Sequence, residues 1–587
     1  VPESKAVDEI ARLVPREVLL AERRGELFGT ETKKLAAQIQ QLSGAVVTER
    51  PGWYFDPYTA RQKLLKHFDV STMEGFGISD SDETLCAAGA ILEYLEETQK
   101  TALGHISRIR GIQPGEFLRI DPTSLRSLEI LRTLRDQSPC GSLLETIDRT
   151  LTGMGSRLMR SLLCMPLCDS SRIRRRQDAI AELLEQEGFC SDLRDLLKHI
   201  ADLERIAARI STGRATPRDL VAAALTLRKI PPMRRRLCQC EGELLAELAA
   251  QCDSMDDLAD LLEKAIQPDP PAHLRDGGVI CAGFDSQLDK LRSLSKDGRS
   301  FLADYQQKEI QRTGIANLKI GFNKVFGYYI EVGHSMSDKV PSDYIRKQTV
   351  KNAERYITEP LKEYEEQVLT ASEKALAREQ ELFEQIRAEA ARYIGRLQAL
   401  AEAIAQIDTL ASFAYLARQN HYIRPQITDG GELVIIEGKH PVLAELMGAE
   451  FVLNDVELGT EGSDLAILTG PNMAGKSTYI RQAALLVLLA QTGSFIPAKE
   501  ARIGLVDRIF TRVGASDELT RGQSTFMVEM TETANILNNA TEKSLVILDE
   551  VGRGTSTYDG LSLAWAITEH LANTVKSERF LPRTITN

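Results

Sequence analysis

The chain has 587 residues, which is too long for a single hydrophobic core, so we expect several domains. Its 43% hydrophobic and 27% charged residues are typical of a cytoplasmic globular protein, and no apolar run is long enough to predict a membrane span or a membrane partner. The net charge of -12 excludes a chain that is basic throughout, although nucleic-acid binding depends on local charge.

The first residues, Val1-Pro2-Glu3-Ser4, contain neither an initiator methionine nor a signal segment, and we interpret the chain as a fragment. Nine cysteines are scattered along the sequence, and their spacing does not match a zinc site. Reduced thiols are therefore expected.

The N-terminal part divides into two predicted domains. Residues 1–75 combine short helices with the apolar stretch Gly44–Thr48, which indicates part of a small α/β domain. Residues 76–281 are rich in helical patterns, and the run Pro268–Pro271 ends them.

Two long helical segments follow. Residues 282–314 are predicted to form an arm helix, because apolar residues recur along one face from Phe284 to Ile310. Residues 358–430 are predicted to return as a second helix, since no proline interrupts the helical spacing from Leu361 to Arg424. A continuous helix of that length would span about 95 Å, which is too long for one globule.

A basic β-rich module is predicted between these helices, at residues 315–357. Apolar and polar residues alternate in Leu318–Asn323 and Tyr328–Val332, with Gly327 at the bend. Residues 311–356 contain eight Lys or Arg and four Asp or Glu, a local charge of +4. This composition suggests a clamp around an extended partner, and the alternative is a solvated charged face.

The last predicted domain, residues 431–587, contains an apolar strand at Leu465–Leu468 that leads into the pattern G-x-x-x-x-G-K-[ST]. In this pattern backbone N–H groups surround phosphate oxygens, the lysine reaches the β- and γ-phosphates, and the hydroxyl holds Mg²⁺. Tyr479–Ala490 is predicted to be a helix whose N-terminal end faces the same phosphates. The pattern thus predicts an ATP and Mg²⁺ site formed by Gly470, Pro471, Asn472, Met473, Ala474, Gly475, Lys476, Ser477 and Thr478.

A second buried strand, Ser544–Glu550, ends in two carboxylates. Asp549 is predicted to serve Mg²⁺ together with Ser477, while Glu550 activates water and Lys476 is the second catalytic residue. Paired acids also occur at solvated strand ends. That alternative fits less well here, because this strand follows the phosphate-binding loop by about seventy residues.

These residues resemble the MutS family of DNA mismatch-repair ATPases in five stretches that extend over nearly the whole chain: Thr152–Arg157, Gln348–Tyr356, Thr469–Thr478, Ser524–Met530 and Leu548–Gly560. The resemblance implies a multidomain fold of α/β and α type. Its parts would be a partial connector α/β domain, a helical core and lever with long helices, a small β-rich DNA clamp and a C-terminal P-loop ATPase domain of the ABC type.

The resemblance also implies partners. Ser524 would contact the γ-phosphate bound by the opposite subunit, so the composite site implies a homodimer. Lys351 and Asn352 would touch the DNA backbone, which positions the protein without reading sequence, and Lys324, Arg346 and Lys347 are further candidates. We expect a nucleoid-associated, ATP-gated sliding clamp for mispaired or looped double-stranded DNA, acting with a downstream factor of the MutL type.

Two departures from the family pattern limit these expectations. The N-terminal domain with a Phe-x-Glu motif, on which mismatch reading depends in the family, is not in the sequence. The tail Asn573–Asn587 stands where the family has a strand and a Thr-His pair that senses the γ-phosphate. We therefore expect ATP binding to be retained better than hydrolysis or dimerisation, and mispairs to be bound with poor preference.

Two other functions stay open at this point. One is a MutS relative that binds branched DNA or recombination intermediates without reading mismatches. The other is a structural ABC-type protein that uses ATP only to dimerise, although Asp549 and Glu550 argue against it.

Overall fold

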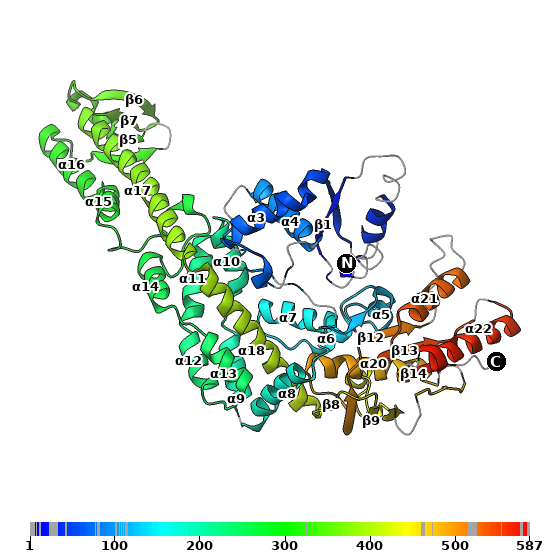
Figure 1. Ribbon diagram of the computed structural model, residues 1–587. Coiled ribbons are helices and arrows are strands. Elements are labelled where there is room, and N and C mark those ends of the chain that lie inside the picture. Colours follow the sequence, from blue (N-terminus) through cyan, green and yellow to red (C-terminus); the bar gives the residue numbers. More distant parts are fainter. Residues whose placement is uncertain are drawn as a thin grey trace. The chain divides into compact units, whose positions relative to one another are not determined.

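The computed structural model contains many helices and four small sheets (Figure 1). It divides into two compact units, the first of residues 1–212, 229–254 and 395–587 and the second of residues 213–228 and 255–394. It describes all residues except 1–5, 7–8, 11–12, 14, 23–32, 41–43, 77, 79–82, 100–102, 105, 107, 110, 112–114, 187, 297, 324–326, 460–463, 472–473, 514–524, 553–554, 576–578 and 584–587.

The N-terminal part of the first unit has the expected α/β character. Strands β1 (Glu17–Ala21) and β2 (Val46–Arg50) pair in parallel, and helices α3 (Pro57–Phe68) and α4 (Glu83–Gln99) pack together. Gly89 allows this close packing, because a Cβ there would lie 2.4 Å from the Cβ of Ala60. Short 3₁₀ turns at Gly52–Phe55 and Glu74–Phe76 connect these elements.

A helical region forms the centre of the first unit. Several of its helices begin at a Ser, Thr or Asp whose side chain accepts a hydrogen bond from a first-turn N–H, which stabilises the helix start. The helices are α5 (Pro122–Ser127), α6 (Leu143–Ile147), α7 (Gly153–Cys164), α8 (Ser170–Glu185), α9 (Phe189–Leu197), α10 (Leu203–Ser211), α12 (Ile230–Leu237), α13 (Glu243–Gln251) and α18 (Ile394–Asn420).

A buried carboxylate joins α18 to the start of α7. Asp408 of α18 accepts hydrogen bonds from the Thr152 N–H and hydroxyl, both at 2.7 Å, and from the Leu151 N–H at 3.0 Å. Gly155 leaves room for it, because a Cβ there would lie 2.3 Å from the carboxylate oxygen. Burial raises the pKa of Asp408, although the hydrogen bonds from Thr152 and Leu151 oppose the shift.

Two sheets lie in the C-terminal part of the first unit. The first has the order β10-β9-β11-β8 and consists of β8 (Gln426–Thr428), β9 (Leu433–Gly438), β10 (Asn454–Leu458) and β11 (Glu500–Gly504). The second has the order β14-β13-β12-β3, is parallel, and consists of β3 (Arg119–Ile120), β12 (Arg508–Arg512), β13 (Ser544–Asp549) and β14 (Arg579–Arg583). The accompanying helices are α19 (Pro441–Met447), α20 (Lys476–Thr492), α21 (Thr525–Asn539) and α22 (Thr557–His570).

The buried strand predicted at Ser544–Glu550 is confirmed as β13, because all six of its residues are buried. A continuous apolar run is what a parallel sheet covered on both faces requires. The strand predicted at Leu465–Leu468 is wrong as a regular strand, since only isolated bridges occur at its two ends. Ile467 is 53% exposed, so the segment lacks the cover on both faces that its composition suggested.

The tail adds a strand to the second sheet. Residues Arg579–Arg583 form β14 and pair in parallel with β13. A π-helical turn at Leu571–Val575 follows α22 along the chain, and His570 is the last residue of α22.

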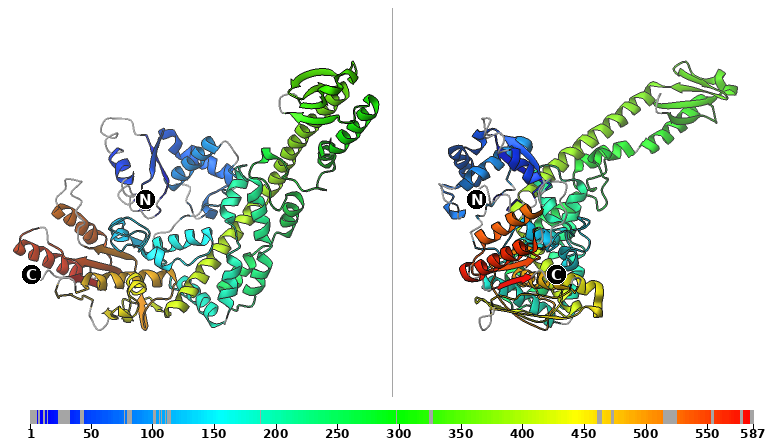
Figure 2. Two further views of the ribbon diagram at one scale, coloured as in Figure 1. Left: turned by 180° about the vertical axis from the view of Figure 1, so that it is seen from behind. Right: turned by 90° about the vertical axis from the view of Figure 1, so that its right-hand side faces the viewer.

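The second unit holds a β-rich tip and the long helix α17 (Glu359–Ala391), which lies beside α15 (Ser286–Lys296) (Figure 2). Its tip is an antiparallel sheet of order β4-β5-β7-β6, and β4 and β5 confirm the alternation seen in the sequence. The elements are α11 (Pro217–Leu227), α14 (Asp256–Ala265), α16 (Gly298–Thr313), β4 (Lys319–Asn323), β5 (Gly327–Gly333), β6 (Ile345–Val350) and β7 (Ala353–Ile357).

Of the two long helical segments that were predicted, the second is not continuous. The first is helical in α15 and in α16, and residue 297 between them lies outside the described residues. The second divides into α17 and α18, because the Arg392 N–H bonds to the carbonyl groups of Glu389 and Ala390 and closes a tight turn. With 33 residues, α17 spans about 50 Å at ~1.5 Å per residue.

None of the helices in the described part of the chain is both long enough and apolar enough to cross a membrane.

Candidate functional site

The predicted phosphate-binding loop ends at the first turn of α20. Gly475 has a φ of 84°, in the left-handed region that favours glycine, and α20 begins at the next residue, Lys476. The first N–H groups of a helix have no acceptor within the helix and attract anions. Ser477 and Thr478 lie in this first turn and are half-buried, whereas Asn472 and Met473 lie outside the described residues.

The ammonium group of Lys476 points back into the loop. Its Nζ donates to the carbonyl oxygen of Pro471 at 2.9 Å and to that of Gly470. These two carbonyl oxygens are the negative partners that phosphate oxygens would replace. A Cβ on Gly475 would meet no atom of the described residues within 4 Å, so the turn itself is not crowded.

The helix that carries this loop is tightly held. From Gln482 to Thr492 every residue of α20 is buried, and α20 packs against β13. Tyr479 donates its hydroxyl to the carbonyl oxygen of Asp455 at 2.8 Å, and Asn454 donates to Gln482 at 3.3 Å, so the start of β10 is fixed to α20.

The two predicted carboxylates follow each other at the carboxyl end of β13. Asp549 is 3% exposed, and Glu550 is half-buried with a φ of 54°. A positive φ is disfavoured for a residue with a side chain, so this turn must be held by its surroundings. Gly552, also left-handed at 86°, packs directly on α22, because a Cβ there would lie 2.7 Å from the Cα of Gly560.

These residues fit the phosphate chain of a nucleotide and Mg²⁺. The loop offers backbone donors and one ammonium group, while Ser477 and Asp549 offer the oxygen ligands that Mg²⁺ prefers. Ser524 lies outside the described residues, and α21 begins at the next residue, Thr525. Among the described residues, no group of three or more His, Cys, Asp or Glu forms a further metal site.

Four of the five predicted DNA contacts are exposed residues of the tip. Lys351 and Asn352 form the turn between β6 and β7, where the His334 ring is 3.0 Å from the carbonyl oxygen of Val350. Lys347 is also exposed, and among the described residues neither lysine has a carboxylate within ion-pair distance.

The other two predicted DNA contacts are placed differently. Arg346 is exposed, but its guanidinium lies 3.2 Å from Glu354 and is therefore partly neutralised. Lys324 lies outside the described residues. Arg355 is held within the tip, because its guanidinium pairs with Glu331 at 3.0 Å and lies over the ring of Tyr329 at 4.4 Å.

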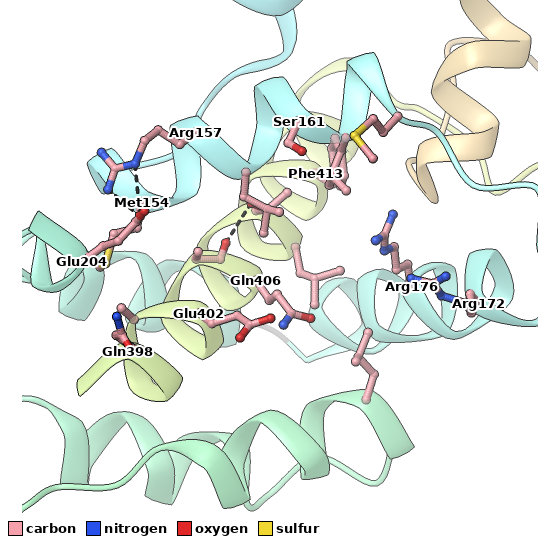
Figure 3. A pocket seen from close by; sticks show the side chains of 18 of the residues that line it. Met154, Arg157, Ser161, Arg172, Arg176, Glu204, Gln398, Glu402, Gln406 and Phe413 are labelled. Atoms are coloured by element: carbon pink, nitrogen blue, oxygen red, sulfur yellow. Dashed lines mark hydrogen bonds and ion pairs between the residues drawn. The ribbon is translucent and has the colours of Figure 1, made fainter. Parts of the chain in front are cut away.

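A cavity of about 660 Å³ lies elsewhere in the first unit, among α7, α8 and α18 (Figure 3). Its arginines already have partners: Arg172 pairs with Glu116 at 2.8 Å, Arg176 donates to the carbonyl oxygen of Thr492 at 2.8 Å, and Arg157 pairs with Glu204. Burial, followed by the neighbouring Arg172, lowers the pKa of Arg176 to about 10.

The cavity therefore lies where these helices pack together, and its arginines serve to connect them. Because Arg176 reaches the last residue of α20, it attaches α8 to the far end of the helix that starts at the predicted phosphate-binding loop. A cation at the carboxyl end of a helix is electrostatically favourable.

The fold is that of a multidomain protein of mixed α/β type, with long helices and small sheets. Three family descriptions match the chain, namely MutS domain II over residues 1–107, MutS domain III over residues 123–414 and MutS domain V over residues 466–584. The chain belongs to the MutS family.

Individual relatives agree with this assignment. The chain is 49% identical over 572 residues to the DNA mismatch repair protein MutS of Rhodopirellula baltica, covering 97% of this chain and 63% of that protein. It is 48% identical over 568 residues to the MutS of Symbiobacterium thermophilum, covering 96% and 64%, and 47% identical over 575 residues to that of Myxococcus xanthus, covering 97% and 64%. The chain therefore spans less than two thirds of the length of these relatives.

Two buried carboxylates that hold other elements in place could not be predicted from the sequence. Asp408 lies more than 250 residues from the Thr152–Arg157 stretch that it caps, so only Gly155 in that stretch hinted at a close neighbour. Glu529 lies within the quoted stretch Ser524–Met530, but its bond to the turn after β13 is visible only in the fold.

Proposed function

We propose that this chain binds and hydrolyses ATP and uses the nucleotide to control its grip on DNA in mismatch repair. The observation that carries the proposal is the open, left-handed Gly475 turn at the start of α20, with Lys476 aimed into the loop and α20 packed on the strand that ends in Asp549. Relatives named DNA mismatch repair protein MutS support the same function.

Each residue would have a separate task. Backbone N–H groups of Gly470–Thr478 bind phosphate oxygens, and Lys476 exchanges its carbonyl partners for the β- and γ-phosphates. Ser477 and Asp549 would hold Mg²⁺, which neutralises phosphate charge when it is bound. Glu550 orients and deprotonates the attacking water, and its half-buried position beside β13 suits a general base.

A second copy of the chain completes the site in this proposal. Ser524, one residue before α21, contacts the γ-phosphate held by the other copy, so ATP favours a homodimer. Closure of two tips around a duplex then gives a sliding clamp, which passes its signal to a partner of the MutL type at the nucleoid. Lys347 and Lys351 grip the phosphate backbone and set the salt dependence of binding.

The test compares binding of this chain to homoduplex, mispaired duplex and four-way junction DNA at several salt concentrations, with and without ATP. We expect duplex binding that weakens with salt, changes with ATP and prefers mispairs only weakly. Glu550→Gln should retain ATP binding and lose turnover. A parent chain that does not bind ATP would overturn the proposal, and a strong preference for the junction would favour action on branched DNA.

A further inference from the structure

The turn that carries Glu550 is held by a residue from another element. The Gly552 N–H donates to Oε1 of Glu529 at 2.5 Å, and Glu529 is 3% exposed. Glu529 lies on α21, twenty-three residues earlier in the chain. A carboxylate that accepts a backbone N–H in a buried site forms a charge-assisted bond, which is stronger than one between neutral groups.

The buried charge of Glu529 is balanced by Arg512, the last residue of β12. Their side chains are 6% and 3% exposed, and the guanidinium lies 4.0 Å from Glu529. Arg512 also pairs with Glu532, one turn further along α21, at 3.1 Å. Because a buried carboxylate needs a partner, Arg512 helps to hold Glu529 in place. β12, α21 and the turn after β13 are therefore joined at one point.

The turn is constrained from its other side by α22. Gly552 and Gly560 touch through their backbones, and a Cβ on Gly560 would lie 2.5 Å from the carbonyl oxygen of Gly552. Glu550, two residues before Gly552, has the disfavoured φ of 54°. Without the bond to Glu529, this backbone loses one of the constraints seen among the described residues, and we expect the Glu550 carboxylate to shift.

We propose that Glu529 is a positioning residue. It holds the Glu550 carboxylate where that group can activate the attacking water, and it links this carboxylate to α21. This inference rests on the proposed function, in which Glu550 is the general base.

The test uses the full chain and three variants. Glu529→Ala removes the acceptor, Glu529→Gln keeps an oxygen for the Gly552 N–H but loses the charge, and Glu532→Gln is the control that changes the same arginine without touching the turn. We expect Glu529→Ala to slow hydrolysis of bound ATP about 100-fold, because a displaced base loses its geometry. Glu529→Gln should lose less than about tenfold, Glu532→Gln should match the parent, and ATP affinity should stay within about twofold in all three.

Hydrogen–deuterium exchange at the Gly552 amide measures the same bond without turnover. It should be faster in Glu529→Ala than in the parent, and close to parent in Glu529→Gln, with thermal unfolding of each variant as the stability reference. Unchanged Gly552 exchange in Glu529→Ala would overturn the inference, and so would equal losses of hydrolysis in Glu529→Ala and Glu532→Gln. If the parent and Glu550→Gln hydrolyse ATP at the same rate, the proposed function fails, while the Gly552 exchange still decides the role of Glu529.

Discussion

The candidate nucleotide site and the β-rich tip use charged residues in opposite ways. At the candidate nucleotide site the strand before Glu550 is buried at all six positions, and Lys476 is held by hydrogen bonds to the loop. At the tip four of the six residues of β6 are exposed, and Lys347 and Lys351 extend into solvent. This difference matches the two proposed tasks. Hydrolysis of a phosphate bond requires groups in fixed positions, whereas binding to a DNA backbone requires only positive charge at the surface.

This contrast predicts large effects for changes in the interior of the first unit and small, additive effects at the tip. Asp408→Ala should have the largest effect on stability. Three donors lose their buried acceptor, and we expect the free energy of unfolding to fall by about 4 kcal/mol. Urea unfolding would measure this, with Asp408→Asn as a milder change. A loss below about 1 kcal/mol would contradict the structural role of the carboxylate.

Lys476→Ala should weaken ATP binding about 100-fold, because it removes the charge aimed into the phosphate-binding loop. Titration with a fluorescent ATP analogue would measure the affinity. Lys499→Ala is the matched control, since this exposed lysine pairs with Glu437 in the same unit at 2.7 Å and has no role in the loop. Equal affinities for the two variants would remove Lys476 from the site.

His440 predicts an effect of acid on stability. Burial, followed by the charge of Arg481, lowers its pKa from 6.5 to about 4 in the folded chain. Below pH 6.5 the unfolded chain therefore binds a proton that the folded chain does not, and stability is lost as the pH falls toward 4. His440→Asn keeps a cap for the Leu443 N–H. Between pH 7 and pH 5 this variant should lose roughly 2 kcal/mol less stability than the parent.

The smallest effect is expected at the tip. Lys351→Ala should lower the slope of log affinity against log salt by about one for duplex DNA, because one phosphate contact is lost. Arg346→Ala should change the slope less, since Glu354 already neutralises part of its charge. An unchanged slope for Lys351→Ala, measured by anisotropy at several salt concentrations, would show that this turn does not touch the DNA.

Local patterns predicted the elements that depend on neighbouring residues. The buried run of β13 and the helix after Gly475 follow from composition and spacing alone, and so do the two strands around Gly327. The mixed α/β fold with long helices was likewise predictable. The resemblance to MutS was found from five short stretches.

Features that depend on distant contacts were not predictable. The apolar spacing of Ile386, Tyr393 and Leu397 continues across the break between α17 and α18, so it does not reveal the turn at Arg392. Pro582 and the charged residues around it concealed β14, which depends on pairing with β13. For the same reason the bond from Gly552 to Glu529 needed the fold, because sequence spacing does not report it.

The contact between Gly552 and Gly560 also bears on how natural variants of this chain are interpreted. Neither glycine carries a functional group, and a change to alanine alters neither charge nor polarity. Yet one added methyl group at Gly560 would meet the opposing carbonyl oxygen at 2.5 Å. A variant at either position, which a scale of chemical similarity would rate as mild, should therefore be classed with substitutions of Glu550 itself.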